Sequence, residues 1–142
     1  MRPFYIDITV RFSETDLQGH VFFANYLDYF DVALLEYQKA VGYPYQRMVA
    51  DGVDIVYLEA QCRYYEGARF DDVLRVYCAV EHLGNTSLRF GFEVERLSDG
   101  ARIVTGAITA VTVDRETRRP VRVPEAFRQA IVGSVSNGST DH

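Results

Sequence analysis

Cysteine and histidine are scarce in this chain of 142 residues. The two cysteines, Cys62 and Cys78, fit no metal-ligand spacing and lie within strand-like patterns, where a reduced thiol behaves as a small hydrophobic side chain. The three histidines, His20, His82 and His142, are too far apart in the sequence to predict a histidine metal site. We therefore expect no metal site.

The sequence also lacks an excess of positive charge and a long apolar run. Its 15 basic and 20 acidic residues give a formal net charge of −5, which argues against a nucleic-acid-binding protein because such proteins usually present a basic face. No window approaches a membrane span, and the N-terminus carries no apolar run of the signal-peptide type. We expect a cytoplasmic protein without a membrane span.

The length and composition are those of one globular domain. The hydrophobic fraction of 48% and the charged fraction of 25% are ordinary, and the chain is long enough to bury a substantial core. We expect a single domain over residues 1–133. The small and polar stretch that follows, residues 134–142, is expected to form a flexible tail.

The order of hydrophobic patterns predicts an α+β fold. Apolar residues alternate in the strand-like runs and recur every three or four residues in the helical ones. The predicted strands cover residues 4–12, 55–65, 73–83, a run marked by Leu88, Phe90, Phe92 and Val94, and residues 102–114; the predicted helices cover residues 25–41 and 124–132. We expect the long first helix to be wrapped by a strongly curved antiparallel sheet of about five strands, with a short helix at the C-terminus.

The stretch from Arg11 to Tyr26 joins the first strand to the long helix and carries titratable side chains. Asp16 and His20 precede a helix N-terminus, whose first N–H groups have no acceptor within the helix and can bind a developing oxyanion. A carboxylate and an imidazole at such a position suit acid–base or nucleophilic chemistry. The structural alternative is a polar turn that caps the helix, and Glu14 is expected to be a solvated surface residue.

Three segments of the chain resemble one known family. These are Asp16-x-x-Gly19-His20-Val21 followed by Asn25-Tyr26-Leu27, the run Tyr64-Tyr65-Glu66-Gly67-Ala68-Arg69-Phe70-Asp71-Asp72-Val73-Leu74, and Gly84-Asn85-Thr86-Ser87. Together they resemble the 4-hydroxybenzoyl-CoA thioesterase-like family of hotdog-fold acyl-CoA thioesterases. The resemblance covers roughly residues 5–113.

The resemblance implies a set of roles in hydrolysis of a thioester to a free acid and CoA. Asp16 corresponds to the catalytic aspartate, acting as nucleophile or general base, and the Phe23 backbone N–H polarises the thioester carbonyl. His20 either participates directly or orients Asp16. Gly19 permits the sharp loop. The expected substrate-binding positions are Gly19, Val21, Tyr26, Thr86 and Ser87.

The resemblance also implies partners. The family assembles as homodimers or homotetramers with active sites at subunit interfaces, and it needs no cofactor, since CoA is part of the substrate. The carrier is CoA or an acyl-carrier protein. A basic cluster, Arg115, Arg118, Arg119 and Arg122, is a candidate for binding phosphates, although a solvated turn is the commoner explanation. A related branch uses a helix glutamate, for which Glu36 is the formal candidate but is expected to be a surface residue.

Two other functions fit the same residues. A hotdog hydratase or dehydratase would use His20 with an acid to add water to an enoyl thioester without releasing a thiol. A non-catalytic module would bind an acyl-CoA without turnover. The acyl group itself is not predicted by the sequence, because the many aromatic residues suit a core or an interface as well as a substrate pocket.

Overall fold

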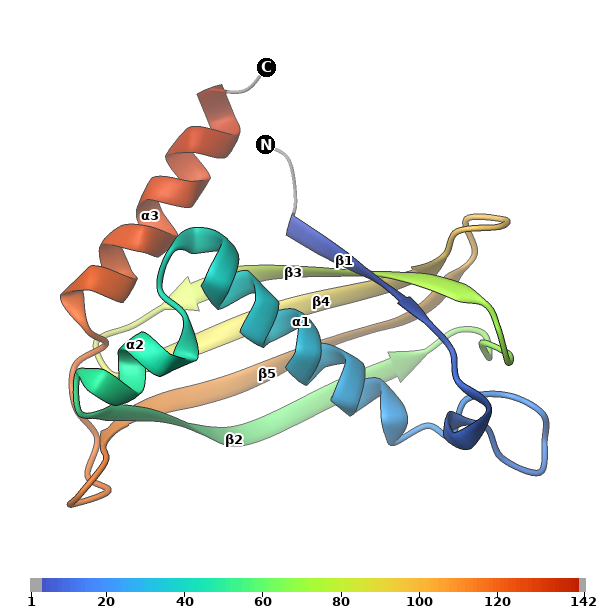
Figure 1. The fold of residues 1–142 in the computed structure, drawn as a ribbon, viewed down its shortest axis with the longest axis horizontal. Coiled ribbons are helices and arrows are strands. Elements are labelled where there is room, and N and C mark those ends of the chain that lie inside the picture. Colours follow the sequence, from blue (N-terminus) through green and yellow to red (C-terminus); the bar gives the residue numbers. More distant parts are fainter. Residues whose placement is uncertain (1–3, 141–142) are drawn as a thin grey trace.

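A five-stranded antiparallel sheet and one long helix form the two main layers of the protein (Figure 1). The computed structural model describes residues 4–140, with side chains described to residue 135. The elements in chain order are β1 (Phe4–Thr9), the 3-10 helix η1 (Phe12–Glu14), α1 (Asn25–Val41), α2 (Tyr45–Ala50), β2 (Val53–Tyr64), β3 (Val73–Leu83), β4 (Ser87–Arg96), β5 (Arg102–Asp114) and α3 (Glu125–Thr140). The strand order in the sheet is β1-β3-β4-β5-β2.

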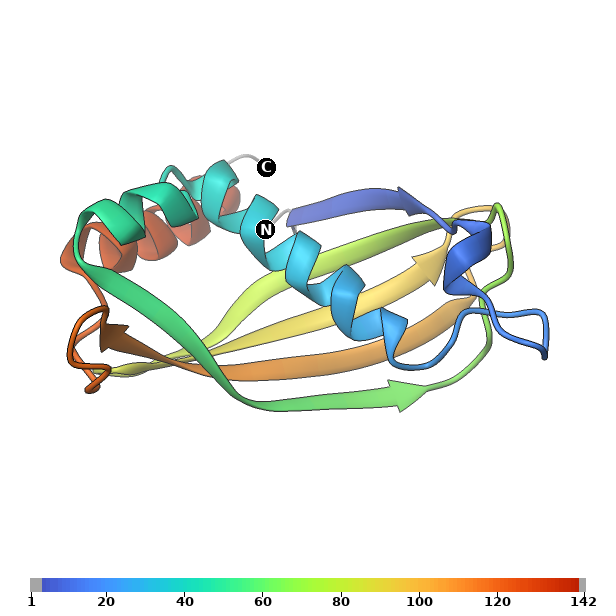
Figure 2. The same ribbon diagram turned by 60° about the horizontal axis from the view of Figure 1, so that its bottom comes forward.

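The core lies between α1 and the face of the sheet that curves around it (Figure 2). The Phe30 ring of α1 stacks on the Phe92 ring of β4, with centroids 4.4 Å apart, and Tyr37 meets Phe90 about two helical turns further along. The alternating side chains of β4 that face α1 are all buried. The predicted α+β class, with a long helix wrapped by a curved sheet, is confirmed.

The buried face of α1 differs from the predicted stripe. Helix α1 begins and ends where predicted, and Gly42 at φ 93° closes it in the left-handed conformation that favours glycine. However, Phe23 and Leu27, which the pattern placed in the apolar stripe, are 60% and 37% exposed. The prediction was wrong for Phe23 because it precedes the helix, and for Leu27 because it lies at the edge of the buried face. The buried face is centred on Tyr26, Tyr29, Phe30, Ala33, Leu34 and Tyr37.

The first strand is shorter than predicted. It ends at Thr9, and Phe12, predicted to share its buried face, is 76% exposed. Val10 still bonds to the connection between β2 and β3, through Asp71 and Asp72. Beyond it the chain leaves the sheet and turns into η1, so the strand alternation no longer applies.

The C-terminal helix α3 is longer than predicted. It continues to Thr140, past the predicted end at Val132, and packs through Phe127, whose ring stacks on Tyr43 with centroids 5.0 Å apart. The predicted domain limits and the flexibility of residues 134–142 stay predictions. The last two of those residues, 141–142, lie outside the described part of the chain.

Candidate active site

A tight turn presents Asp16 between η1 and α1. The Asp16 carbonyl accepts the Gly19 N–H at 3.0 Å, and the Asp16 N–H donates to the His20 carbonyl at 3.0 Å. Gly19 has φ +84°, in the region that favours glycine, so it fits the predicted role of permitting the sharp loop. Asp16 Oδ1 accepts the Gln18 N–H at 2.8 Å, which is an Asx-type turn. The predicted structural role, a polar turn, therefore occupies one carboxylate oxygen of Asp16, and the side chain remains partly exposed.

The residues after this turn rest on the connection between β2 and β3. The Val21 N–H donates to the Ala68 carbonyl at 2.8 Å, and His20 and Arg69 form an antiparallel bridge. Val21 is 3% exposed and belongs to the core. The His20 ring lies against Gly67, where a Cβ would be 2.9 Å from the imidazole Cγ. The His20 side chain thus packs on the Gly67 backbone, and the His20 carbonyl closes the turn that carries Asp16.

The start of α1 offers backbone N–H groups. The Phe22 N–H donates to the Glu14 carbonyl and the Asn25 N–H to the Phe22 carbonyl, each at 2.9 Å. The N–H groups of Phe23 and Ala24 have no protein acceptor within the described residues. They lie immediately before a helix of 17 residues, at its positive end, where N–H groups can stabilise negative charge on an oxygen.

Glu14 is buried, and the prediction of a solvated surface residue was wrong. Its carboxylate accepts the Arg11 N–H at 2.8 Å, the Arg11 guanidinium at 2.8 Å and the Tyr29 hydroxyl at 3.0 Å. Burial alone would raise the pKa of Glu14, but these donors outweigh it and hold that pKa below the usual 4.5. Helix η1 turns the side chain inward, where it finds enough donors to stay charged.

Aromatic side chains surround the start of α1. Phe22 and Phe23 are exposed and 4.7 Å apart between ring centroids, and Phe23 meets Tyr64 edge to face at 6.2 Å. The Tyr64 hydroxyl donates to the Phe23 carbonyl at 3.1 Å. Tyr26 is 2% exposed, and its hydroxyl accepts the Ala68 N–H at 3.2 Å. Burial raises the pKa of Tyr26, so it remains neutral. Apolar surface of this kind suits an acyl chain beside the free N–H groups.

Thr86 and Ser87 lie at the opposite end of the sheet from Asp16. They follow β3, whereas the Asp16 turn lies beside its beginning (Figure 1). The strand has 11 residues and therefore separates the two ends by about 35 Å. The Thr86 carbonyl accepts the Thr112 N–H of β5 at 2.8 Å, so it is bonded to the neighbouring strand. One chain does not bring these two residues to Asp16.

The basic cluster lies at the same far end. Arg115 and Arg118 pair with Asp54 at 3.5 and 3.3 Å, and Arg122 hydrogen-bonds Asn85 at 2.8 Å. These partners satisfy part of the charge that the sequence offered to phosphates. Glu36, the formal alternative to Asp16, pairs with Lys39 on the helix surface at 3.1 Å.

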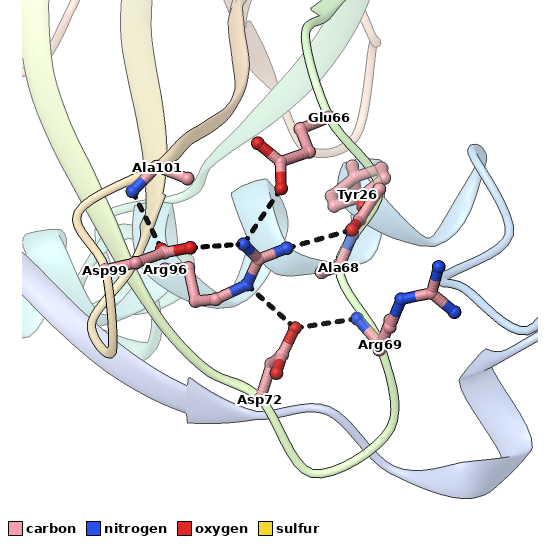
Figure 3. A network of polar contacts seen from close by, with 9 residues as sticks. Tyr26, Glu66, Ala68, Arg69, Asp72, Arg96, Asp99 and Ala101 are labelled. Carbon is pink, nitrogen blue, oxygen red and sulfur yellow. Dashed lines mark hydrogen bonds and ion pairs between the residues drawn. The ribbon is translucent and has the colours of Figure 1, made fainter.

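A buried arginine, Arg96, holds the connection beneath the Asp16 loop, and the sequence did not predict it. Arg96, at the end of β4, contacts Glu66, Asp72 and Asp99 and the Gly67 carbonyl (Figure 3). A signal was present: a basic residue ends an apolar strand, and acidic residues stand in both neighbouring connections. The pattern alone does not show that they converge.

A separate open hollow of about 770 Å³ lies over β2 to β5, and its polar lining includes Arg63, Tyr77 and Glu93. None of the predicted site residues lines it, so we place the candidate site at the Asp16 loop, which carries the carboxylate and leads into the free N–H groups before α1. Among the described residues, no cluster of three or more potential ligands could hold a metal ion, and no helix is both long and apolar enough to span a bilayer.

Comparisons with known proteins identify the family. A putative esterase of Aquifex aeolicus is 37% identical over 92 residues, covering 65% of this chain and 72% of the relative. The acyl-CoA thioester hydrolase YbgC of Escherichia coli is 24% identical over 84% of this chain and 89% of its own length. The crystal structure of the hypothetical protein AQ1494 of Aquifex aeolicus matches with a TM-score of 0.85 and 29% identity, over 91% of this chain and 99% of that one.

The family model of the thioesterase-like superfamily matches residues 10–131. This span includes the Asp16 loop, α1 and all strands after it. The predictions of a hotdog fold and of a thioester hydrolase are confirmed at the level of the family. The chain belongs to the thioesterase-like superfamily.

Proposed function

We propose that the protein is an acyl-CoA thioesterase in which Asp16 and the N-terminus of α1 form the catalytic centre. The observation that carries this proposal is the unpaired N–H of Phe23, seven residues after Asp16 on a loop fixed at both ends. Family membership and the acyl-CoA thioester hydrolase named among the relatives support the substrate class.

Hydrolysis of a thioester requires only a carboxylate and a hydrogen-bond donor to the carbonyl oxygen. Overall, water hydrolyses the thioester at its carbonyl carbon: the C–S bond breaks, and the products are the free acid and the CoA thiol. Asp16 either attacks that carbon to form an anhydride that water then opens, or removes a proton from the attacking water. In both cases negative charge develops on the carbonyl oxygen. The Phe23 N–H stabilises it, and one such donor contributes about 2.7–4 kcal/mol to catalysis.

We propose that a second subunit completes the site. Thr86 and Ser87 lie about 35 Å from Asp16 within one chain, so their contact with the pantetheine arm requires a partner. The edge strand β2 supports such an assembly, because Tyr57 and Leu58 are 41% and 63% exposed there. The assembly is a homodimer or homotetramer. A cytoplasmic location is consistent with the two free cysteines.

The test is hydrolysis of an acyl-CoA panel followed by detection of free thiol. The panel includes aromatic, short, branched and long acyl groups. We expect Asp16→Ala and Asp16→Asn to lower kcat at least about 100-fold, as for loss of a group that transfers a proton or forms the covalent bond. Glu36→Gln is the control, because it removes one carboxylate on α1 that pairs with Lys39 at the surface, and its kcat should be unchanged.

The outcomes separate the alternatives. Turnover that survives both Asp16 substitutions removes Asp16 from the mechanism. Water addition to an enoyl-CoA without thiol release would instead support a hydratase. Tight binding of every acyl-CoA with neither reaction would support a non-catalytic binding module.

A further inference from the structure

Arg96 joins three carboxylates and one carbonyl with a single guanidinium (Figure 3). Its side chain is only 11% exposed. The Nη1 atom lies 3.0 Å from Glu66 and 2.9 Å from Asp99, and the Nε atom lies 3.0 Å from Asp72. The Nη2 atom donates to the Gly67 carbonyl at 3.0 Å. All three nitrogens of the fork are therefore in use.

The acceptors belong to two connections at the same end of the sheet. Glu66, Gly67 and Asp72 lie between β2 and β3, and Asp99 lies in the turn between β4 and β5. A planar guanidinium that is nearly buried and bound by several acceptors holds them in one geometry. Arg96 thus fixes the β2–β3 connection relative to the end of β4.

That connection is the surface on which the Asp16 loop rests. The Ala68 carbonyl accepts the Val21 N–H, and the His20 ring packs directly against Gly67. Gly67 therefore does two things: its carbonyl accepts the hydrogen bond from Arg96, and its Cα supports the His20 ring. His20 and Val21 lie between Asp16 and Phe23 in the sequence, so a shift of their backbone passes along the chain to both residues.

We propose that Arg96 is a positioning residue for thioester cleavage. Through the Gly67 carbonyl it holds the backbone beneath His20 and Val21, and so keeps Asp16 and the Phe23 N–H in their productive relation. This inference rests on the proposed function. A displacement of about 1 Å in such an arrangement can lower the rate about 100-fold, even when the changed residue does not touch substrate.

Arg96→Lys is the first variant. It keeps the positive charge, but a lysine ammonium cannot span acceptors spread around a planar fork. We expect kcat to fall about tenfold or more while KM changes less than about twofold, since binding contacts remain. The ring protons of His20, followed by NMR, should shift in the same variant.

Gly67→Ala is the second variant and changes no charge. Its Cβ would meet the His20 ring at 2.9 Å, so it displaces the imidazole from the same residue that Arg96 holds. We expect the same fall in kcat and a shift of the His20 ring protons. The double variant should lose no more than the worse single variant, because both changes act through one contact.

Arg75→Lys is the matched control. Arg75 on β3 pairs with Asp7 at 2.9 Å, with its side chain 27% exposed, and makes no contact with the β2–β3 connection among the described residues. We expect its kcat and the His20 resonances to be unchanged.

Three results would overturn the inference. An Arg96→Lys variant with a lower temperature of unfolding but unchanged kcat and His20 resonances would make Arg96 merely structural. Multiplying effects of Arg96→Lys and Gly67→Ala on kcat would make the two changes independent. Wild-type protein that hydrolyses no acyl-CoA would remove the proposed function, and a His20 shift in Arg96→Lys would then show the structural link without a catalytic role.

Discussion

Glu14 holds the start of α1 through two separate sets of bonds. Its carboxylate is bound by Arg11 and by the buried hydroxyl of Tyr29, whose pKa is raised by burial and by this contact. Its carbonyl accepts the Phe22 N–H and the Asn25 side chain, each at 2.9 Å. A change in this one side chain therefore reaches the residues that flank the free N–H groups.

We expect Glu14→Gln to lower the free energy of unfolding by about 2 kcal/mol at neutral pH, since bonds to a charged acceptor are lost. The folded-state pKa of Glu14 lies below 4.5, so its charge stabilises the fold above that pH and ceases to do so as the pH falls through the folded pKa. The difference between wild type and variant, measured by urea denaturation, should accordingly shrink below about pH 4.5.

The control for this prediction is Glu36→Gln, whose carboxylate is 45% exposed beside Lys39. Its effect should stay within about 0.5 kcal/mol at every pH. A difference between wild type and Glu14→Gln that is constant from pH 7 to acid would contradict the assignment of a charged, bonded Glu14.

At the residue scale, the sequence predicted the positions whose hydrogen bonds join residues close together along the chain. Gly19 and the Asp16 turn belong to a few consecutive residues, so their spacing is informative. Glu14 and Arg96 were missed because each combines a partner three residues away with partners far along the chain: Tyr29 is 15 residues from Glu14, and Glu66 is 30 from Arg96. Charged residues in loops are usually solvated, and only the folded backbone shows which of them converge.

At the scale of elements, the packing of α1 on the sheet depends on a glycine. Gly106, in the middle of β5, lies under the Phe30 ring, where a Cβ would be 2.6 Å from the nearest ring carbon. The same Cβ would also meet the Gln61 carbonyl of the neighbouring strand. The approach of helix to sheet is therefore set by the absence of a side chain.

We expect Gly106→Ala to lower the free energy of unfolding by about 3 kcal/mol, because neither the stacked ring nor the β2 backbone can move without loosening the core. Gly133→Ala is the control: it lies in α3, a Cβ there meets nothing within 4 Å, and alanine favours a helix by about 0.5–1 kcal/mol. Thermal or urea unfolding measures both changes. Equal effects of the two substitutions would show that Gly106 is not crowded.

The sequence predicted which helices and strands form better than it predicted the residues at which they end. The limits of α1, β3 and β5 agree with the predicted ones, since each element carries a clear apolar pattern and is followed by turn residues. The end of β1 was wrong because Phe12 continues the alternation after the chain has left the sheet. The end of α3 was wrong because small polar residues carry little periodic signal, although they remain helical.

At the scale of the whole molecule, the predicted site residues fall at two ends of the sheet. The family resemblance predicted both groups and the hotdog fold together, because the motifs extend over most of the chain. The hydrophobic pattern could not predict the strand order β1-β3-β4-β5-β2, since pairing between distant strands leaves no trace in local periodicity. It also could not show that one chain holds Asp16 and Thr86 apart.

We expect Leu58→Lys to shift the protein towards a monomer of 16.2 kDa, because a charge on an exposed edge strand opposes pairing with a second copy. Thioesterase activity should fall as the assembly dissociates, since Thr86 and Ser87 of one subunit then no longer meet Asp16 of another. Light scattering coupled to size-exclusion chromatography measures the mass.

Val132→Lys is the control, a similar charge on an apolar residue of α3 that is 51% exposed. Its mass and activity should match those of the wild type. A Leu58→Lys variant that keeps both its mass and its activity would contradict assembly through β2.

The strand order also has a consequence for how the chain reaches its folded state. Strands β3, β4 and β5 follow one another along the chain and pair as neighbours. The edge strands are joined over long separations: Phe4 of β1 pairs with Cys78, and Val53 of β2 pairs with Asp114. Since closing a longer loop costs more entropy, we expect the central three strands to pair before the edge strands join them. The Asp16 loop depends on β1 and on the β2–β3 connection, so we expect it to form after the central strands and to open before them when the native protein unfolds locally.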